Sequence, residues 1–388
     1  MKTIHLLFGM FTLCMLLSAC ASDSTQQSDA AAPTVPSGKP ELFVYVVQYD
    51  DLRLREQPGQ QSKVGSKLPI GELVSGNGET SAQMDTVELR GIPMTSSYNK
   101  VRTNTGKEGW LFGAAVQVLY AGTNMDGPDM SKIQAISRFL SELDPKNLES
   151  GKKAWDHVRK IPADKNPSNA DATLILLELF MRRMEFEGAF YSMTEGLKWE
   201  DADYEAVHGN RFDMNKYPAT KQLAASGFRL AYAEGTVFPV YDLQLFQKYF
   251  STRVGPGMKA YLEQSVLEQQ LSEMSDNGIV ITLEELADRA AFWEKFNRNN
   301  PYFPYKEETK GSQSWLTNAL VLGANNTPVF NYETNEVTPE FRKMWEYAQQ
   351  KYPGTTVASR VKSFADLCAS EGWKRTDKVE AYMGKLQM

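Results

Sequence analysis

The chain has 388 residues, of which 42% are hydrophobic and 23% charged, and its formal net charge at pH 7 is −6. This length is enough for two domains with a sizeable core. A mildly acidic chain lacks the basic footprint of nucleic-acid binding, so we exclude a nucleic-acid partner. The sequence contains no His-Glu-x-x-His, paired Cys-x-x-Cys, Walker loop or Gly-x-Ser-x-Gly elbow. We therefore expect no metal and no cofactor, and no motif names a catalytic residue.

The N-terminus carries the most specific signal in the sequence. An apolar run that begins at Ile4 follows the charge of Lys2 and ends in Leu-Ser-Ala-Cys at residues 17–20. The run is too short to span a bilayer, and small residues close it, which is typical of a cleavable secretory signal. Because a cysteine directly follows Leu-Ser-Ala, this segment resembles the signal peptide of bacterial lipoproteins. The alternative is an ordinary secreted protein with an incidental cysteine.

The lipoprotein resemblance implies where the protein is found. It implies that residues 1–19 are removed and that Cys20 becomes the acylated first residue, with palmitate among several acyl chains. Cleavage changes the net charge from −6 to −6 − 1 = −7, and no basic segment follows that could bind anionic lipids. The implied location is the cell envelope, with the globular part in the periplasm or at the cell surface. In lipoproteins, an acidic residue after the acylated cysteine is the signal for retention in the inner membrane. Ala21 is not acidic, so the resemblance implies the outer membrane in a Gram-negative cell.

The mature chain begins with a polar segment. Residues 21–40 are rich in Ser, Ala, Gln, Pro and Thr and contain almost no large apolar residue. Such a segment cannot bury enough surface to fold, so we predict a flexible linker over residues 20–40. The mature protein has two cysteines, Cys20 and Cys368, and acylation of Cys20 leaves no disulfide.

Residues 41–120 have the pattern of an all-β domain. Several short runs of β-branched, aromatic and alternating residues are separated by close turn signals such as Pro58-Gly59. This pattern predicts a small barrel or sandwich. The predicted strands include 42–47, 52–55, 64–68, 72–74, 100–102 and 109–112.

Three segments of this region resemble the bacterial SH3-like domain. They are Leu-Arg-Leu-Arg-Glu-Gln-Pro-Gly at 52–59, Lys-Val-Arg at 100–102 and Gly-Lys-Glu-Gly-Trp-Leu at 106–111. The resemblance implies an SH3-like barrel, and such modules often bind cell-wall peptide or glycan. The chain departs from the family pattern at Gln57, where glycine is usual, and in an extra segment at about 76–97. Because of these departures, the resemblance is a weaker basis for expecting the family's binding groove in this chain.

From residue 130 onward the hydrophobic period changes to that of helices, after a Gly/Pro/Asp-rich connector at 122–129. The segment 172–183 is apolar nearly all round, which predicts a central, buried helix. Thr282 begins a capping box, and Thr338-Pro339 is an N-cap followed by proline at the first helical position. Cys368 lies on an apolar stripe and is interpreted as a small buried hydrophobe.

The stretch 227–242 contains the candidate ligand-binding residues Arg229, Glu234 and Asp242. In a helix, Gly227, Leu230, Ala231 and Glu234 would share one face, which would carry Glu234 toward the core. A buried carboxylate must be paired or protonated. The alternative is that Glu234 and Asp242 are capping or core-clamping carboxylates.

A second resemblance covers residues 213–332. Residues 227–242 and the segment Gly-Ala-Asn-Asn-Thr-Pro-Val-Phe at 323–330 look like a domain of uncharacterised exported bacterial proteins. That family brings no assigned activity and therefore implies no catalytic residue.

The sequence thus predicts a multidomain protein with a small all-β SH3-like barrel at 41–120 and a mostly α-helical domain at 130–388. The leading hypothesis is a membrane-anchored envelope lipoprotein that binds or scaffolds, with peptidoglycan or an envelope protein as its partner. Two alternatives stay open: an envelope enzyme with a carboxylate-based site in the helical domain, and a helical adaptor for another envelope protein.

Overall fold

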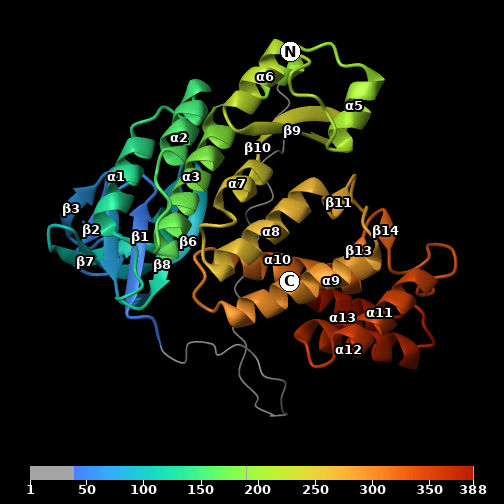
Figure 1. Cartoon of the computed structure of the whole chain (residues 1–388). Coiled ribbons are helices and arrows are strands. Elements are labelled where there is room, and N and C mark those ends of the chain that lie inside the picture. The colour runs from blue at the N-terminus through green and yellow to red at the C-terminus, as the bar shows by residue number, and fades with distance from the viewer. Residues whose placement is uncertain (1–38, 189, 388) are drawn as a thin grey trace. The chain divides into compact units, whose positions relative to one another are not determined.

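The structure, a computed structural model, describes residues 39–188 and 190–387. Cys20, the expected signal peptide and nearly all of the expected linker lie outside these residues. The described chain forms two compact units (Figure 1). The sheet unit contains residues 39–271 and Tyr302–Pro304, and the helical unit contains Ser272–Pro301 and residues 305–387. The boundaries expected at 120 and 130 do not coincide with this division, because the first helices belong to the sheet unit.

The sheet unit begins with an antiparallel sheet of eight strands. The strands are β1 (Leu42–Val47), β2 (Leu52–Arg55), β3 (Val64–Leu68), β4 (Leu73–Gly76), β5 (Thr80–Leu89), β6 (Ile92–Thr103), β7 (Glu108–Phe112) and β8 (Val116–Gly122). Their order is β3-β2-β7-β6-β4-β1-β8, and β5 pairs with β6 off this path. The all-β prediction is therefore confirmed for this region, but the sheet is open, because β3 and β8 at its two ends do not pair.

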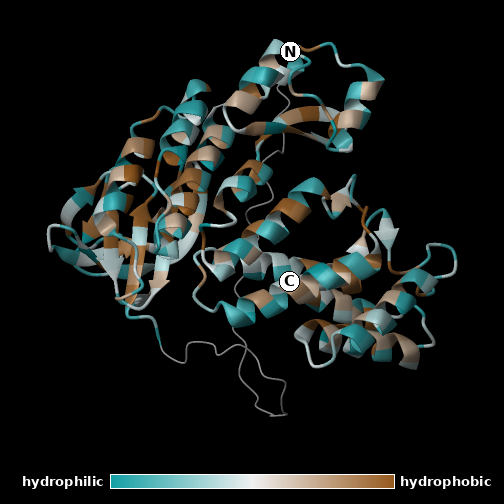
Figure 2. Cartoon of the chain, in the orientation of Figure 1, coloured by the Kyte–Doolittle hydropathy of each residue, from teal (hydrophilic) through white to brown (hydrophobic). Residues whose placement is uncertain are grey.

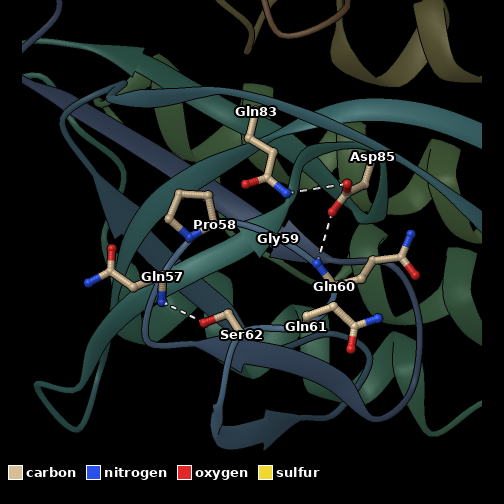
Figure 3. Close-up of a pocket in the computed structure, with 8 residues that line it drawn as sticks. All are labelled: Gln57, Pro58, Gly59, Gln60, Gln61, Ser62, Gln83 and Asp85. Atoms are coloured by element: carbon tan, nitrogen blue, oxygen red, sulfur yellow. Dashed lines mark hydrogen bonds between the residues drawn. The ribbon is translucent and has the colours of Figure 1, made fainter.

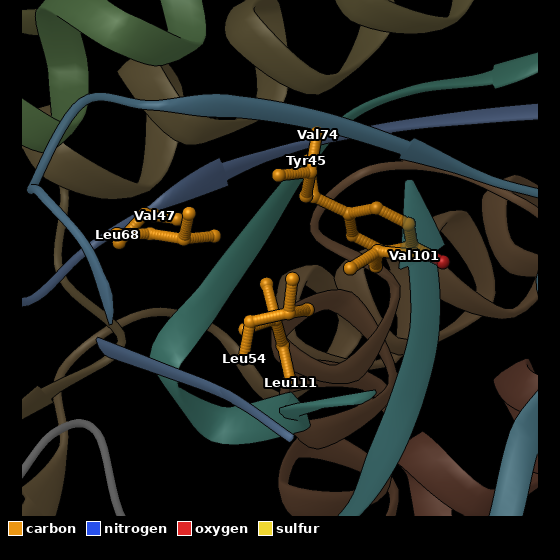
Figure 4. Close-up of a cluster of buried hydrophobic side chains, with 7 residues drawn as sticks. All are labelled: Tyr45, Val47, Leu54, Leu68, Val74, Val101 and Leu111. Atoms are coloured by element: carbon orange, nitrogen blue, oxygen red, sulfur yellow. The ribbon is translucent and has the colours of Figure 1, made fainter. Parts of the chain in front are cut away.

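The interior of the sheet is built from side chains that alternate along the strands. Leu54, Val47 and Leu111 are at most 2% exposed and pack in one cluster (Figure 4). On β2, Leu54 is buried and Arg53 before it is exposed, as the alternation of strand side chains predicts, whereas Arg55 departs from this alternation and is also buried. The remaining buried members of the cluster are Tyr45, Leu68, Val74 and Val101.

The extra segment at 76–97 is a long hairpin made of β5 and the first half of β6. Its register runs from Met84 opposite Ser97 to Leu89 opposite Ile92. The turn residues Arg90 and Gly91 have φ of 49° and 79°, which is the conformation of a two-residue type I′ turn. The hairpin lengthens the sheet where a compact SH3-like domain has a short turn.

Three helices complete the body of the sheet unit: α1 (Met130–Ser141), α2 (Glu149–Arg159) and α3 (Pro167–Glu187). Figure 1 shows α1 and α3 lying across the sheet. The hydroxyl of Ser137 on α1 donates to the carbonyl of Gly71 at 2.7 Å, and the side-chain oxygen of Gln134 accepts from Leu73 N–H at 2.9 Å. These bonds join α1 to the sheet, so the connector at 122–129 runs within one compact unit.

The central helix α3 is buried as the sequence predicts. Leu174, Ile175, Leu177 and Met181 are all 0% exposed, and this part of α3 is brown, hence hydrophobic, in Figure 2. The helix begins at Pro167 after the N-cap Asn166, whose side chain accepts from Ser168 N–H. No helix among the described residues is long and apolar enough to cross a membrane.

The rest of the sheet unit contains α4 (Ser192–Glu195), α5 (Asp201–His208), α6 (Pro218–Ala225), β9 (Phe228–Ala233), β10 (Thr236–Tyr241), α7 (Leu243–Phe250) and α8 (Pro256–Gln270). The helical prediction for 227–234 is wrong, because these residues form the strand β9 of a hairpin. Phe228 and Leu230 are buried while Arg229 between them is half-buried, which is the period of a strand.

The helical unit consists of five helices and two small hairpins within its described residues. They are β11 (Met274–Ser275), β12 (Gly278–Ile279), α9 (Leu283–Asn299), α10 (Lys306–Leu322), β13 (Gly323–Ala324), β14 (Thr327–Pro328), α11 (Pro339–Lys351), α12 (Thr356–Ser370) and α13 (Asp377–Gln387). The predicted cap is confirmed, since the hydroxyl of Thr282 accepts from Glu285 N–H at 3.1 Å. Cys368 is 0% exposed, and burial raises the pKa of its thiol to about 12.

A buried carboxylate joins two helices of the helical unit. Glu294 on α9 is 9% exposed and accepts from Thr356 N–H at 2.7 Å and Val357 N–H at 2.9 Å, in the first turn of α12. A carboxylate at a helix N-terminus satisfies amides that the helix itself leaves unbonded.

We expect Glu294→Ala to lower the free energy of unfolding by about 3 kcal/mol, because it leaves two amides without their acceptor. Glu294→Gln keeps one acceptor oxygen and should cost less than half as much. Chemical unfolding with hydrogen exchange of α12 measures both variants. Equal stability of Glu294→Ala and the wild type would contradict this role of the carboxylate.

Candidate functional site

A polar pocket opens beside the turn between β2 and β3 (Figure 3). Its volume is about 580 Å³. One wall is the turn at residues 57–62, and the other is β5 of the long hairpin, so the pocket exists only because the hairpin is present. The lining consists of Gln57, Pro58, Gly59, Gln60, Gln61, Ser62, Gln83 and Asp85.

The turn is fixed by hydrogen bonds to Ser62. Ser62 N–H donates to the carbonyl of Gly59 at 3.1 Å, and the Ser62 hydroxyl accepts from Gln57 N–H at 2.9 Å. The buried guanidinium of Arg55 donates to the carbonyl of Ser62 at 2.6 Å. These bonds fix the backbone of the turn without a ligand.

Gly59 is required where the turn approaches the hairpin. Its φ is +111°, a conformation that residues with a side chain rarely adopt. A Cβ atom at this position would also lie 2.6 Å from the side-chain nitrogen of Gln83. The absence of a side chain thus lets the amide of Gln83 lie directly against the turn.

Asp85 connects the two walls of the pocket. Its carboxylate accepts from the hydroxyl of Tyr98 at 2.6 Å, from Gln60 N–H at 2.9 Å and from the side-chain amide of Gln83 at 3.4 Å. The hydrogen bond from Tyr98 is the largest cause that lowers the pKa of Asp85. An ionised carboxylate that protein donors already satisfy is suited to holding the pocket together rather than to transferring protons.

The groups left for a ligand are neutral. Among the residues that the structure describes, the exposed side-chain amides of Gln57 and Gln61 form no hydrogen bond. Each amide offers two donors and an acceptor, so the pocket suits hydroxyl and amide groups of an uncharged polar ligand. Within 39–188 and 190–387, no group of three His, Cys, Asp or Glu side chains is arranged to hold a metal ion.

The sequence-based candidates lie elsewhere in the sheet unit, on the β9–β10 hairpin and at its end. Asp242 is the N-cap of α7 and accepts from Gln244 N–H at 2.9 Å and Leu245 N–H at 3.3 Å. Arg229 donates to the side-chain oxygen of Asn210 and, at 2.7 Å, to the carbonyl of Gln269. Burial lowers the pKa of Arg229, and the nearby Asp242 carboxylate opposes this effect.

Glu234 is not brought to the core, contrary to the helical expectation. It is exposed at the tip of the β9–β10 hairpin, where Glu234 and Gly235 have φ of 49° and 77°. Glu234 lies five positions after Arg229, which is about 16 Å of extended backbone. The structure therefore places Arg229 and Asp242 near each other and leaves Glu234 at the far end of the hairpin.

Comparison of the chain with protein-family models, curated proteins and solved structures found no match. No sequence motif marks the pocket as a site, although Gln-Pro-Gly-Gln-Gln at 57–61 concentrates amides around a turn signal. Gln83 joins them only through the hairpin, which no local pattern predicts.

Proposed function

We propose that this protein is a bacterial cell-envelope lipoprotein, anchored by an acylated Cys20, that acts as a binding or scaffolding protein. The Leu-Ser-Ala-Cys sequence at 17–20 supports the anchor. The proposed ligand-binding part is the sheet unit, through an SH3-like arrangement that recognises the cell wall.

The positions of the SH3-like segments support this proposal. The segment at 52–55 is β2, the segment at 100–102 lies in β6, and Gly109-Trp110-Leu111 lies in β7. These three strands are neighbours in the order β2-β7-β6, with Trp110 opposite both Arg55 and Lys100. Arg55 and Trp110, which are 55 positions apart in the sequence, thus pair in one sheet.

The glutamine-lined pocket is the observation that carries the proposal. Gln57 is the position that departs from the SH3-like pattern, and Gln83 and Asp85 belong to the extra hairpin. Both departures therefore line the same pocket. Cell-wall polymers present hydroxyl and amide groups, which are the groups that side-chain amides bind. A carboxylate-based enzyme receives less support, because Glu234 is remote from Arg229 and Asp242 caps a helix.

A cell-wall sedimentation experiment tests the pocket. The chain from residue 22 onward, without lipid, is mixed with purified sacculi, and the bound fraction is measured over a concentration series. We expect wild-type protein to bind and the double variant Gln57→Ala with Gln61→Ala to bind about thirtyfold more weakly, because each of the two lost hydrogen bonds contributes about 1 kcal/mol.

The matched control is Gln222→Ala, which removes an exposed side-chain amide on α6, away from the pocket residues. We expect it to bind as the wild type does. Wild-type recovery no greater than that of an unrelated acidic protein would remove the cell-wall proposal. Equal loss in both variants would remove the pocket as the binding site.

A further inference from the structure

The outer edge of β5 is an unpaired strand edge, which the turn at 57–62 reaches through one bond from Gln60 to Thr86. The pairing of β5 with β6 shifts register before Met84. In the part of the chain that the structure describes, β5 pairs with β6 alone. It is ten residues long and contains neither lysine nor proline, the residues that natural proteins place on exposed edges to prevent pairing. A strand of this length presents about 30 Å of backbone.

The register shows which backbone groups face outward. Leu89 and Ile92 flank the two-residue turn and therefore form a hydrogen-bonded pair, as do Val87 and Asp85 with their partners on β6. The N–H and C=O groups of Met84, Thr86 and Glu88 consequently point away from β6. One bond displays this directly: the side-chain amide of Gln60 donates to the carbonyl of Thr86 at 2.8 Å. The amide of Gln60 thus takes the place of a neighbouring strand's N–H.

The edge is held in position at both ends. At the hairpin tip, the guanidinium of Arg90 lies 4.7 Å from the ring centre of Tyr49, 3.3 Å from the carbonyl of Gln48 and 3.4 Å from the carboxylate of Glu187. Near the base, the hydroxyl of Tyr98 holds Asp85. A fixed edge loses little conformational entropy when a new strand pairs with it.

We propose that the outer edge of β5 binds an extended segment of a partner protein as an additional strand. This function goes beyond cell-wall recognition, because it uses backbone groups of β5 rather than the glutamine side chains. On one face of the added strand, side chains would meet Val87 and Leu89, which pack against the buried Tyr98 cluster. On the other face they would meet Met84, Thr86 and Glu88, which are exposed.

Charge and shape specify the partner's chemistry. The exposed carboxylate of Glu88 has no ion pair with any described residue, so a lysine or arginine of the partner is expected opposite it. The turn at 57–62 is bonded to Asp85 and Thr86, so it lies beside β5. Pairing with a second copy of β5 would bring a second such turn to this edge. A single extended segment brings none, and it has to displace the side chain of Gln60 from Thr86.

A proline substitution tests strand addition specifically. Thr86→Pro removes an N–H that points away from β6, so the β5–β6 pairing is kept. Thr86→Val is the matched control, because it also removes the hydroxyl bonded to Thr95 at 2.7 Å but retains the N–H. The probe is a synthetic peptide of alternating valine and threonine with a lysine near each end. Binding is measured on the full soluble chain by hydrogen exchange of residues 80–90.

We expect the probe to protect this segment in the wild type and in Thr86→Val, and to bind at least tenfold more weakly to Thr86→Pro. A probe with N-methylated backbone amides should give no protection. The proposal is overturned by equal binding of the two Thr86 variants, by binding of the N-methylated probe, or by no protection at about 1 mM probe. Protection that grows with protein concentration in the absence of the probe would overturn it in favour of self-association.

Discussion

Replacing Cys20 with serine is expected to abolish incorporation of labelled palmitate and to leave no acylated mature chain. Serine offers no thiol for thioether attachment, and an acyl chain contributes about 0.8 kcal/mol of membrane binding per buried CH₂ group. The sequence has no basic segment directly after Cys20 to replace this attachment. Mass spectrometry of the N-terminus and fractionation of cells measure the two consequences.

An uncleaved apolar run could itself retain the serine variant at the membrane, so a second variant separates the two anchors. It carries an ordinary cleavable secretion signal in front of Ala21 and therefore has neither lipid nor apolar run. We expect this protein in the soluble fraction. Cys368→Ala, which changes a buried thiol to another small apolar group, should remain in the membrane fraction. Membrane sedimentation of the lipid-free variant at the wild-type level would contradict the proposed anchor.

The elements that the sequence predicts best are those with local signals. Residues 42–47 are a short run of β-branched and aromatic residues, residues 52–55 alternate apolar and basic side chains, and the two segments match β1 and β2. Thr282 and Thr338-Pro339 begin α9 and α11, because an N-cap depends on residues within one turn of the helix. In the same way, the apolar residues at 172–183 predict the buried part of α3 without reference to its neighbours.

The elements that the sequence does not predict depend on contacts between distant residues. The outer strand β5 is largely exposed and has a polar sequence, Thr-Ser-Ala-Gln-Met-Asp, so it lacks the apolar alternation of a half-buried strand. Gln60 meets Thr86 across 26 positions of sequence, which no window of local pattern includes. The pocket is consequently a product of tertiary structure, although its glutamines are visible in the sequence.

The error at 227–234 has a single physical origin, the backbone at Gly227. Gly227 has a φ of +88°, which turns the backbone away from the axis of α6 and allows β9 to begin at Phe228. The helical spacing of Gly227, Leu230 and Ala231 therefore predicts a helix across a position where none continues. The carbonyl of Gly227 accepts from Asp242 N–H at 2.9 Å, which brings the end of the β9–β10 hairpin back to its start.

Gly227→Ala is expected to lower the free energy of unfolding of the sheet unit by about 2–4 kcal/mol. Positive φ costs a residue with a side chain about 1 kcal/mol, and the new Cβ would overlap the indole of Trp155, which is 1% exposed. Forcing atoms into a packed core adds about 1–3 kcal/mol. Chemical unfolding with hydrogen exchange across α2 and β9 measures the loss.

Gly235→Ala separates the two causes. Gly235 has a similar φ of +77°, but a Cβ there would meet nothing within 4 Å. It should therefore lose only the backbone contribution of about 1 kcal/mol, and the difference between the variants is the energy of overlap with Trp155. Equal losses would mean that the packing around Trp155 relaxes. A larger loss for Gly227→Ala would show that close packing, more than turn conformation, requires glycine where α6 gives way to the hairpin that carries Arg229 and Asp242.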